Sequence, residues 1–138
     1  MTNPTKLFPL IVTNKLDETR AYYLEQLGCE LVMEAPGYVQ FRFGDDKAGP
    51  ELAFMQPTDA PVFGGPLPEF GGGGLIVSIP TETADGKYAA LKKKKVELAS
   101  EPADKPWGWR SFAARDPNGL ILDFFHVLDQ AAVADATS

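Results

Sequence analysis

Residues 106–125 read PWGWRSFAARDPNGLILDFF, and this stretch predicts a β-hairpin. Residues 109–115 and the run LILDFFHVL from Leu120 to Leu128 have the length and apolar content of strands. Between them, Asp116-Pro117-Asn118-Gly119 is a strong turn signal, because proline fixes φ and asparagine or glycine accepts positive φ. We therefore expect the domain to end in two paired antiparallel strands.

The order of elements around this hairpin occurs twice along the chain. Residues 37–41 (GYVQF) align with 108–112 (GWRSF), and residues 29–31 (CEL) align with 96–98 (VEL), at separations of about 67 to 71 residues. Each half is predicted to form strand, helix, strand, strand, strand. The expected strands are 7–13, 29–34, 38–43, 51–56, 75–79, 96–100, 109–115 and 120–128, and the expected helices are 15–27, capped by Asn14, and 82–95.

The repeat predicts an α+β fold in which two tandem βαβββ modules form a curved mixed sheet around a ligand trough. With 138 residues, the chain has the length of a single domain. Module 1 is expected at about 6–57 and module 2 at about 74–128, joined by a Gly/Pro-rich linker at 58–73, with a frayed tail at 129–138. The helices would cover the outer face of the sheet, and the inner face would remain open as the trough.

Composition limits the partners and the compartment. The net charge of −6 repels phosphate backbones, so no nucleic acid partner is expected. No window approaches 18 consecutive apolar residues, so no membrane partner is expected either. The lone Cys29 fits a reducing compartment, and the first residues lack the basic segment and cleavage site of a signal peptide. We therefore expect a cytoplasmic protein.

The pattern resembles the vicinal oxygen chelate superfamily, which includes glyoxalase I, extradiol dioxygenases, metal-dependent fosfomycin-resistance enzymes and bleomycin-resistance proteins. Residues 106–125 resemble the last hairpin of that family, and residues 14–28 resemble its first helix with the glycine that follows. The resemblance covers nearly the whole chain and consists mostly of fold signature. It therefore implies the architecture more directly than the reaction.

In metal-dependent members of that family, His, Glu or Gln side chains hold a divalent ion, one near the first strand and one near the last strand of each half. The resemblance places these four positions at Phe8, at Ala53 or Phe54, at Gly74 or Leu75, and at Asp123. Of these residues, Asp123 alone has a side chain that binds metal ions. The chain's one histidine, His126, comes three residues later and is expected on the opposite face of the strand. The departure implies no metal and no cofactor, and it removes the Lewis acid of the family's enzymes.

Among members without a metal, the bleomycin-resistance type is the most similar in character. Those proteins are acidic homodimers that sequester a flat, cationic antibiotic. The resemblance therefore implies a metal-free binding protein for an aromatic or cationic, antibiotic-like small molecule, acting in drug resistance by sequestration, and a homodimer. The expected ligand-binding residues are Phe8, Tyr38, Phe41, Phe54, Trp107, Trp109 and Asp123.

Other interpretations remain open at this point. Phe41 and Phe54 also suit the hydrophobic core, the tryptophans also suit a dimer contact, and Asp123 also suits an ion pair with Arg42 or Arg110. An enzyme of the same fold, a lyase, isomerase or dioxygenase, is the alternative function, with a non-standard metal site or with Asp123 as general base. A structural or regulatory module without a ligand is the third hypothesis.

Overall fold

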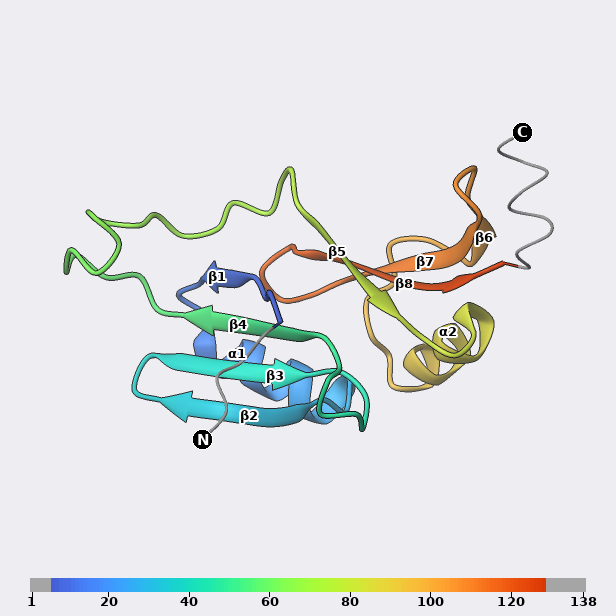
Figure 1. Ribbon diagram of the computed structural model, residues 1–138, viewed down its shortest axis with the longest axis horizontal. Helices are drawn as coiled ribbons and strands as arrows, with labels where there is room; N and C mark the ends of the chain where they lie inside the picture. The colour runs from blue at the N-terminus through green and yellow to red at the C-terminus, as the bar shows by residue number, and fades with distance from the viewer. Residues whose placement is uncertain (1–5, 129–138) are drawn as a thin grey trace. The chain divides into compact units, whose positions relative to one another are not determined.

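The computed structural model describes residues 6–128, and the predicted tail at 129–138 lies outside the described residues. The chain divides between Gly71 and Gly72 into two compact units, one for each half of the repeat (Figure 1). Each unit contains one four-stranded mixed sheet and one helix, so the expected α+β fold of two tandem βαβββ modules is confirmed. The hydrogen bonds run within each module, so the β-structure consists of two open, curled sheets of four strands.

In the first module the strand order is β1-β4-β3-β2. Its strands are β1 (Leu10–Val12), β2 (Glu30–Ala35), β3 (Tyr38–Arg42) and β4 (Glu51–Met55). β1 pairs parallel with β4, and the other pairs are antiparallel. The expected first strand, 7–13, is longer than the observed β1. Pro9 lies within the expected range, and it has no N–H with which to extend the ladder toward the N-terminus.

The first helix, α1 (Leu16–Ala21), continues as a π-helical segment, η1 (Tyr22–Gln26), which the sequence pattern did not predict. The expected cap at Asn14 is wrong: Lys15 occupies the N-cap position and makes no side-chain capping bond. The hydroxyl of Thr13 instead accepts the backbone N–H of Lys15 at 2.9 Å. Gly28 follows the helix with φ of +69°, a conformation that favours glycine, as expected for this position.

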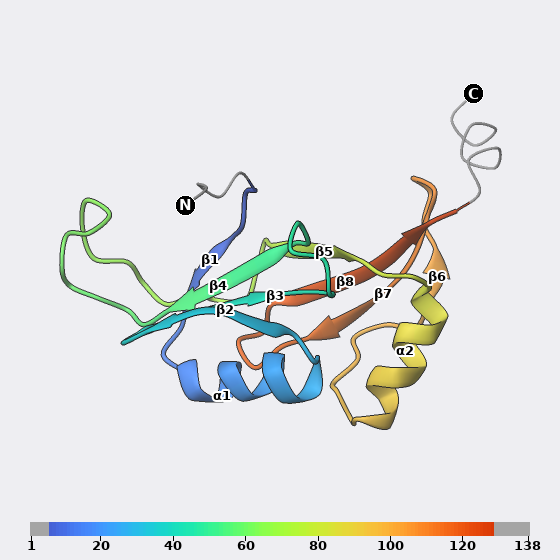
Figure 2. The same ribbon diagram turned by 60° about the horizontal axis from the view of Figure 1, so that its bottom comes forward.

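The core of the first module lies between its sheet and this helix (Figure 2). Tyr23 is stacked on Phe41 with ring centroids 5.1 Å apart, and it lies 5.2 Å from the ring of Phe54. All three side chains are fully buried. The opposite face of the sheet carries Tyr38, Gln40 and Arg42 along β3, as the alternation predicts.

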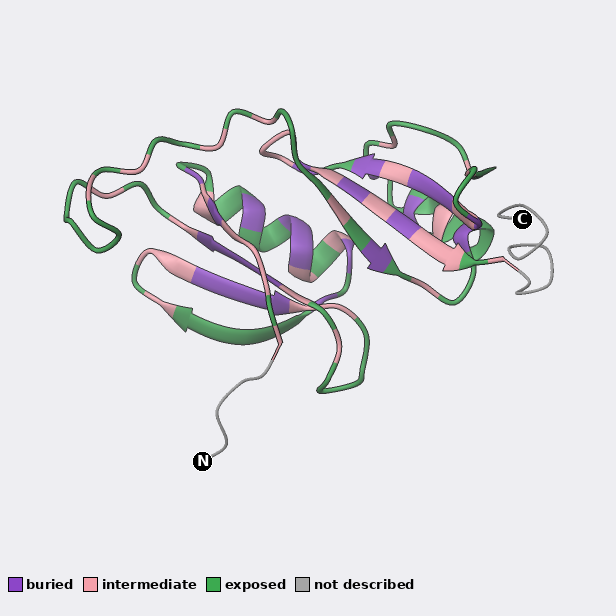
Figure 3. Cartoon of the chain, turned by 45° about the horizontal axis from the view of Figure 1, so that its top comes forward, coloured by how far each residue is buried: buried purple, intermediate pink, exposed green. Residues whose placement is uncertain are grey.

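The second module repeats the arrangement with strand order β5-β8-β7-β6. Its elements are β5 (Ile76–Pro80), α2 (Ala84–Lys93), β6 (Ala103–Asp104), β7 (Trp109–Arg115) and β8 (Ile121–Val127). Phe112 and Phe124 stack at 5.4 Å beneath α2, and the ring of Tyr88 meets Phe112 edge-on. Figure 3 shows buried and less buried residues alternating along much of β8, so this strand has one core face and one open face.

The strand expected at residues 96–100 forms only in part. Leu98 makes an isolated bridge with Ala114, and the regular strand β6 begins at Ala103. The backbone N–H groups of Ala99 and Ser100 both donate to the carbonyl of Ala113. Two donors on one acceptor displace the chain from a regular register, which interrupts the strand.

Residues 56–75, all of which the structure describes, contain no helix or strand. Within this segment the N–H of Phe70 donates to the carbonyl of Val12 at 2.9 Å, so the segment covers part of the edge of β1. Among the described residues there is no helix that is both long and apolar enough to cross a membrane.

Candidate functional site

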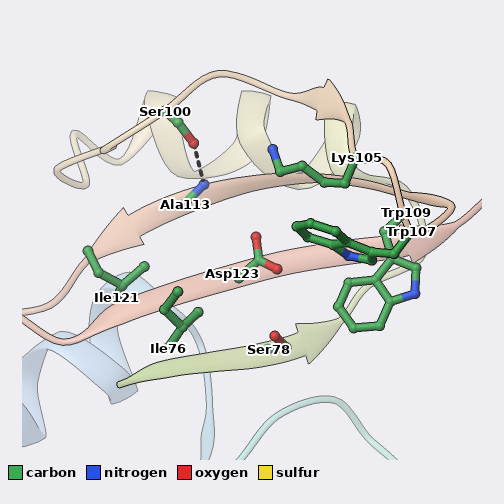
Figure 4. A pocket seen from close by; sticks show the side chains of 9 residues that line it. All are labelled: Ile76, Ser78, Ser100, Lys105, Trp107, Trp109, Ala113, Ile121 and Asp123. Atoms are coloured by element: carbon green, nitrogen blue, oxygen red, sulfur yellow. Dashed lines mark hydrogen bonds between the residues drawn. The ribbon is translucent and has the colours of Figure 1, made fainter. Parts of the chain in front are cut away.

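The candidate site is a pocket of about 350 Å³ on the open face of the second module. Its residues come from β5, from the chain before β7, and from β7 and β8, and Figure 4 shows them around the carboxylate of Asp123. The lining residues are Ile76, Ser78, Ser100, Lys105, Trp107, Trp109, Ala113, Ile121 and Asp123. The volume is within the range of small-molecule sites in proteins.

Strand pairing places Asp123 in the floor of this pocket. In register, Asp123 lies between Ser78 of β5 and Ala113 of β7. Its side chain is half-buried. Within residues 6–128, no hydrogen bond or ion pair is formed by its carboxylate. A carboxylate in this position therefore has its lone pairs available to a ligand.

The two arginines expected near Asp123 pair with other carboxylates. Arg110 is on the opposite face of β7 and forms ion pairs with Asp85 of α2 and with Asp104. These hydrogen bonds raise the pKa of Arg110, and they lower the pKa of Asp85. Arg42 belongs to the first module and pairs with Glu30. Of the two alternatives left open for Asp123, the ion pair with Arg42 or Arg110 is therefore not formed.

Tryptophan rings form one wall of the pocket. Trp109 stacks on Phe125 with ring centroids 3.8 Å apart and planes inclined by 12°, and Trp107 meets Trp109 edge-on at 6.4 Å. Trp107 remains 57% exposed. The structure thus brings together three of the expected ligand-binding residues: Trp107, Trp109 and Asp123.

His126 is on the other face of β8, as expected. Its Nδ1 accepts the backbone N–H of Ala84 at 2.8 Å, in the first turn of α2. That N–H has no partner inside the helix, so His126 acts as a cap supplied by a neighbouring strand. His126 is therefore directed away from the pocket that contains Asp123.

The first module contains the other four expected residues, and none of them lines this pocket. Phe41 and Phe54 are fully buried against Tyr23, so their packing is that of core residues. Phe8 precedes β1 and is half-buried. Tyr38 is on the open face of the first sheet, where its hydroxyl donates to Oε1 of Gln40 at 2.7 Å.

A chain of polar contacts occupies that open face. Nε2 of Gln40 donates to Glu51 at 2.5 Å, and the ammonium of Lys6 donates to the other carboxylate oxygen at 2.8 Å. Burial raises the pKa of Glu51, but the hydrogen bonds from Lys6 and Gln40 outweigh it, and the net pKa is below the ordinary value. Burial and the charge of Glu51 both raise the pKa of Tyr38. These side chains therefore satisfy one another's hydrogen-bonding groups within the first module.

The residues present do not fit the divalent metal that the family's enzymes bind. In the first module, β1 and β4 pair Leu10 with Ala53 in register, and neither side chain has a ligand atom. In the second module, Asp123 has the hydroxyl of Ser78 as its neighbour on β5. Among residues 6–128, no three His, Cys, Asp or Glu side chains come close enough to hold a metal ion.

Sequence reasoning missed several lining residues, notably Lys105, Ile76 and Ser78. The period-two pattern of β5 and β8 contains a signal for some of them, since Ile76 and Ser78 pair in register with Ile121 and Asp123. Lys105 lies in an irregular segment just after the short β6, where no periodicity indicates which way a side chain points.

The comparisons with known proteins agree with this architecture. A family model described as "Glyoxalase/Bleomycin resistance protein/Dioxygenase superfamily" matches residues 7–124. The chain belongs to this superfamily. The expected resemblance is therefore confirmed, and it covers both modules. No curated protein matches the sequence significantly.

Solved structures of superfamily members share the fold. A glyoxalase/bleomycin resistance protein/dioxygenase from Nocardioides is 25% identical with a TM-score of 0.70, and the match covers 94% of this chain and 87% of that one. A glyoxalase/bleomycin resistance protein from Streptomyces sp. CB03234 is 20% identical, with a TM-score of 0.62 and coverage of 86% and 97%. TioX from Micromonospora sp. ML1 is 18% identical, with a TM-score of 0.68 and coverage of 91% and 100%. At these identities, the last two similarities show the fold alone.

Proposed function

We propose that the pocket of the second module binds an aromatic or cationic, antibiotic-like small molecule without a metal, and that the protein confers drug resistance by sequestering it. The observation that carries the proposal is Asp123, an unpaired carboxylate in a pocket walled by tryptophan. A carboxylate removed from water is stabilised by a cation that enters with the ligand. Tryptophan faces attract both cations and planar rings.

The superfamily's name includes bleomycin resistance proteins, which supports a binding role alongside its enzymes. The donor set supports the metal-free form of the proposal, because three of the expected ligand positions carry Phe8, Ala53 or Phe54, and Gly74 or Leu75 in place of metal-binding side chains. Lewis-acid chemistry needs several ligands that converge on one ion. Affinity for a small molecule needs only the pocket that is present.

Tryptophan fluorescence tests this proposal directly. The chain has two tryptophans, and both line the pocket, so a change in emission reports on this site. We expect at least one planar cationic antibiotic, with bleomycin as the first of the series, to quench the emission saturably. If no compound in such a panel changes the tryptophan emission, the drug-binding proposal is wrong.

Asp123→Asn provides the matched variant, because it removes the charge and preserves the shape. A hydrogen bond to a charged group contributes about 1.5–3 kcal/mol, so we expect affinity for the cation to fall by roughly 10- to 100-fold. Asp59→Asn, at an exposed site in the segment between the modules, should leave affinity unchanged. Equal affinities of Asp123→Asn and the native protein would contradict the assigned role of Asp123.

The proposal extends to assembly and location. Trp107 and Ile76 at the pocket are more than half exposed, which supports completion by a second copy in a homodimer. Light scattering should then give about 30 kDa, twice the 15.0 kDa of one chain, and a 15.0 kDa particle would refute the dimer.

The single, buried Cys29 supports a reducing compartment, and we propose that the protein is located in the cytoplasm.

A second candidate function also uses Asp123. Its free lone pairs in a pocket suit a general base, as a lyase or isomerase of this superfamily would require. In that case Asp123→Asn should lower kcat by about 10²- to 10⁴-fold for the true substrate, with little change in binding. A dioxygenase with a non-standard metal site would instead show one metal ion per chain by elemental analysis of the purified protein.

A further inference from the structure

Two opposite charges line the pocket without pairing with each other. Asp123 is in the floor, and Lys105 is in the wall beside β7, on the same side of the pocket as the tryptophans in Figure 4. Within the described part of the chain, neither forms an ion pair. Within residues 6–128, the one hydrogen bond of the Lys105 ammonium is a long one, 3.5 Å to the carbonyl of Ser111. An ammonium has three donors, so most of its hydrogen-bonding capacity remains available.

Several other cations of the described chain do form ion pairs. All four arginines form ion pairs with carboxylates. Lys6 uses three acceptors, namely Glu51 and the carbonyls of Lys47 and Gly49. Asp123 and Lys105 differ from these groups because neither forms an ion pair within the described residues, although both line the pocket.

Backbone hydrogen bonds hold Lys105 in position. Its N–H donates to the carbonyl of Trp109 at 2.6 Å, and its carbonyl accepts the N–H of Gly108 at 3.0 Å. Gly108 has φ of +87°, which closes the turn 105–108 without steric strain. The same turn presents Trp107, so the cation and one aromatic ring reach the pocket from a single hydrogen-bonded unit.

We infer that the ligand is zwitterionic: a planar aromatic body with a cationic group directed to Asp123 and an anionic group, such as a carboxylate, directed to Lys105. This inference rests on the proposed binding function and defines its ligand class. The tryptophans would contact the planar body. A ligand with one charge would leave the other pocket charge partly desolvated and unpaired, which is unfavourable.

Three acridines of matched shape test the inference by tryptophan fluorescence and calorimetry. The probes are 9-aminoacridine, a monocation at neutral pH; acridine-4-carboxylate, an anion; and 9-aminoacridine-4-carboxylate, the zwitterion. We expect the zwitterion to bind about tenfold or more tightly than the monocation, which corresponds to one additional charge-assisted hydrogen bond. The anion alone should bind weakest, because it meets Asp123 without a countercharge.

Variants assign each end of the zwitterion. Lys105→Gln should reduce its advantage over the monocation to less than about twofold, with monocation affinity retained. Asp123→Asn should instead weaken the monocation and the zwitterion alike. The exposed Lys93→Gln on α2 is the control for lost charge and should change neither affinity. Near-UV circular dichroism checks that each variant is folded.

The outcomes separate this inference from the proposed function. Equal binding of monocation and zwitterion, or an advantage that survives Lys105→Gln, overturns the zwitterion inference and leaves cation binding intact. Failure of all three probes to bind overturns the inference, while the antibiotic titration above decides the proposed function independently.

Discussion

At the scale of single residues, Glu51 shows how the first module satisfies its own polar groups. Its side chain is 8% exposed, and both carboxylate oxygens accept hydrogen bonds, one from Lys6 and one from Gln40. Because Lys6 also binds two backbone carbonyls, the carboxylate helps to hold the start of the described chain against the loop before β4. Glu51 begins the strand expected at 51–56, but its partner 45 residues away could not be predicted from local sequence.

The lowered pKa of Glu51 predicts a pH dependence of stability. Because its pKa is lower in the folded than in the unfolded state, the stabilisation is present above about pH 4.5 and is lost as pH falls through the folded-state pKa. Glu51→Gln should lower the free energy of unfolding by about 1–3 kcal/mol at pH 7 and by less at pH 3. Urea denaturation at both pH values measures this. The control Asp59→Asn should show no such difference, and an equal loss at both pH values would contradict the ionic role.

Phe41 provides a second test at the residue scale, because its packing is that of a core side chain while sequence analysis placed it among the ligand-binding residues. Phe41→Ala should lower the free energy of unfolding by about 3–5 kcal/mol. The milder Phe41→Leu should remain folded and retain native ligand affinity, as measured by tryptophan fluorescence. Phe63→Leu, at an exposed site, should leave stability unchanged. A loss of ligand affinity in a folded Phe41→Leu protein would instead indicate that Phe41 belongs to the ligand-binding site.

At the scale of elements, the sequence predicted hairpins better than helix ends. The turn at 116–119 forms as expected, with Asp116 Oδ1 accepting the N–H groups of Asn118 and Leu120, because its conformation is encoded within four residues. The start of α1 was misassigned because Thr13, one residue before the expected cap, provides the hydroxyl. The π-helical segment was missed because it buries both Tyr22 and Tyr23, which is a requirement of tertiary packing.

The end of α2 has a strained residue that can be relieved. Lys95 is the one described residue other than glycine with positive φ, at 60°. Lys95→Gly should raise the free energy of unfolding by about 0.5–1 kcal/mol, because glycine accepts this conformation without a clash with Cβ. Ala90→Gly, at an exposed position within α2, should lower it by about 1 kcal/mol and serves as the opposite control. Thermal denaturation compares the two, and destabilisation by Lys95→Gly would contradict the strain argument.

At the scale of the whole molecule, the repeat was readable because each module encodes the same order of turns and apolar strands. The structural differences between the two modules were harder to predict from the sequence. Aromatic residues were expected to contribute to the site from both halves, whereas the structure buries Phe41 and Phe54 under a helix and exposes Trp107 at a pocket edge. Helix-facing and open-face aromatics have similar spacing in a strand, so the choice depends on which face the helix covers.

The segment between the modules predicts a site of proteolysis. Val62 and Phe63 are about 60% exposed, and this region has no helix or strand. We expect chymotrypsin to cleave first after Phe63, because an exposed segment without helix or strand fits a protease more readily than a paired strand. Trp107 should be cut more slowly, since the N–H of Lys105 ties its turn to Trp109 of β7 with a hydrogen bond of 2.6 Å. Mass spectrometry of the first fragments identifies the site, and Phe63→Ser should abolish it. Early cleavage within β7 or β8 would contradict the prediction that the segment between the modules is cut before the paired strands.

The polar side chains on the open face of the first module bond to one another, and this determines how many ligand molecules each polypeptide binds. Tyr38, Gln40, Glu51 and Lys6 bond to one another across the face that, in the second module, is hollowed around Asp123. On this face, one module is thus closed by its own side chains, whereas the other has an open pocket. Calorimetry should give a stoichiometry of one ligand per polypeptide, in spite of a tandem architecture that formally offers two.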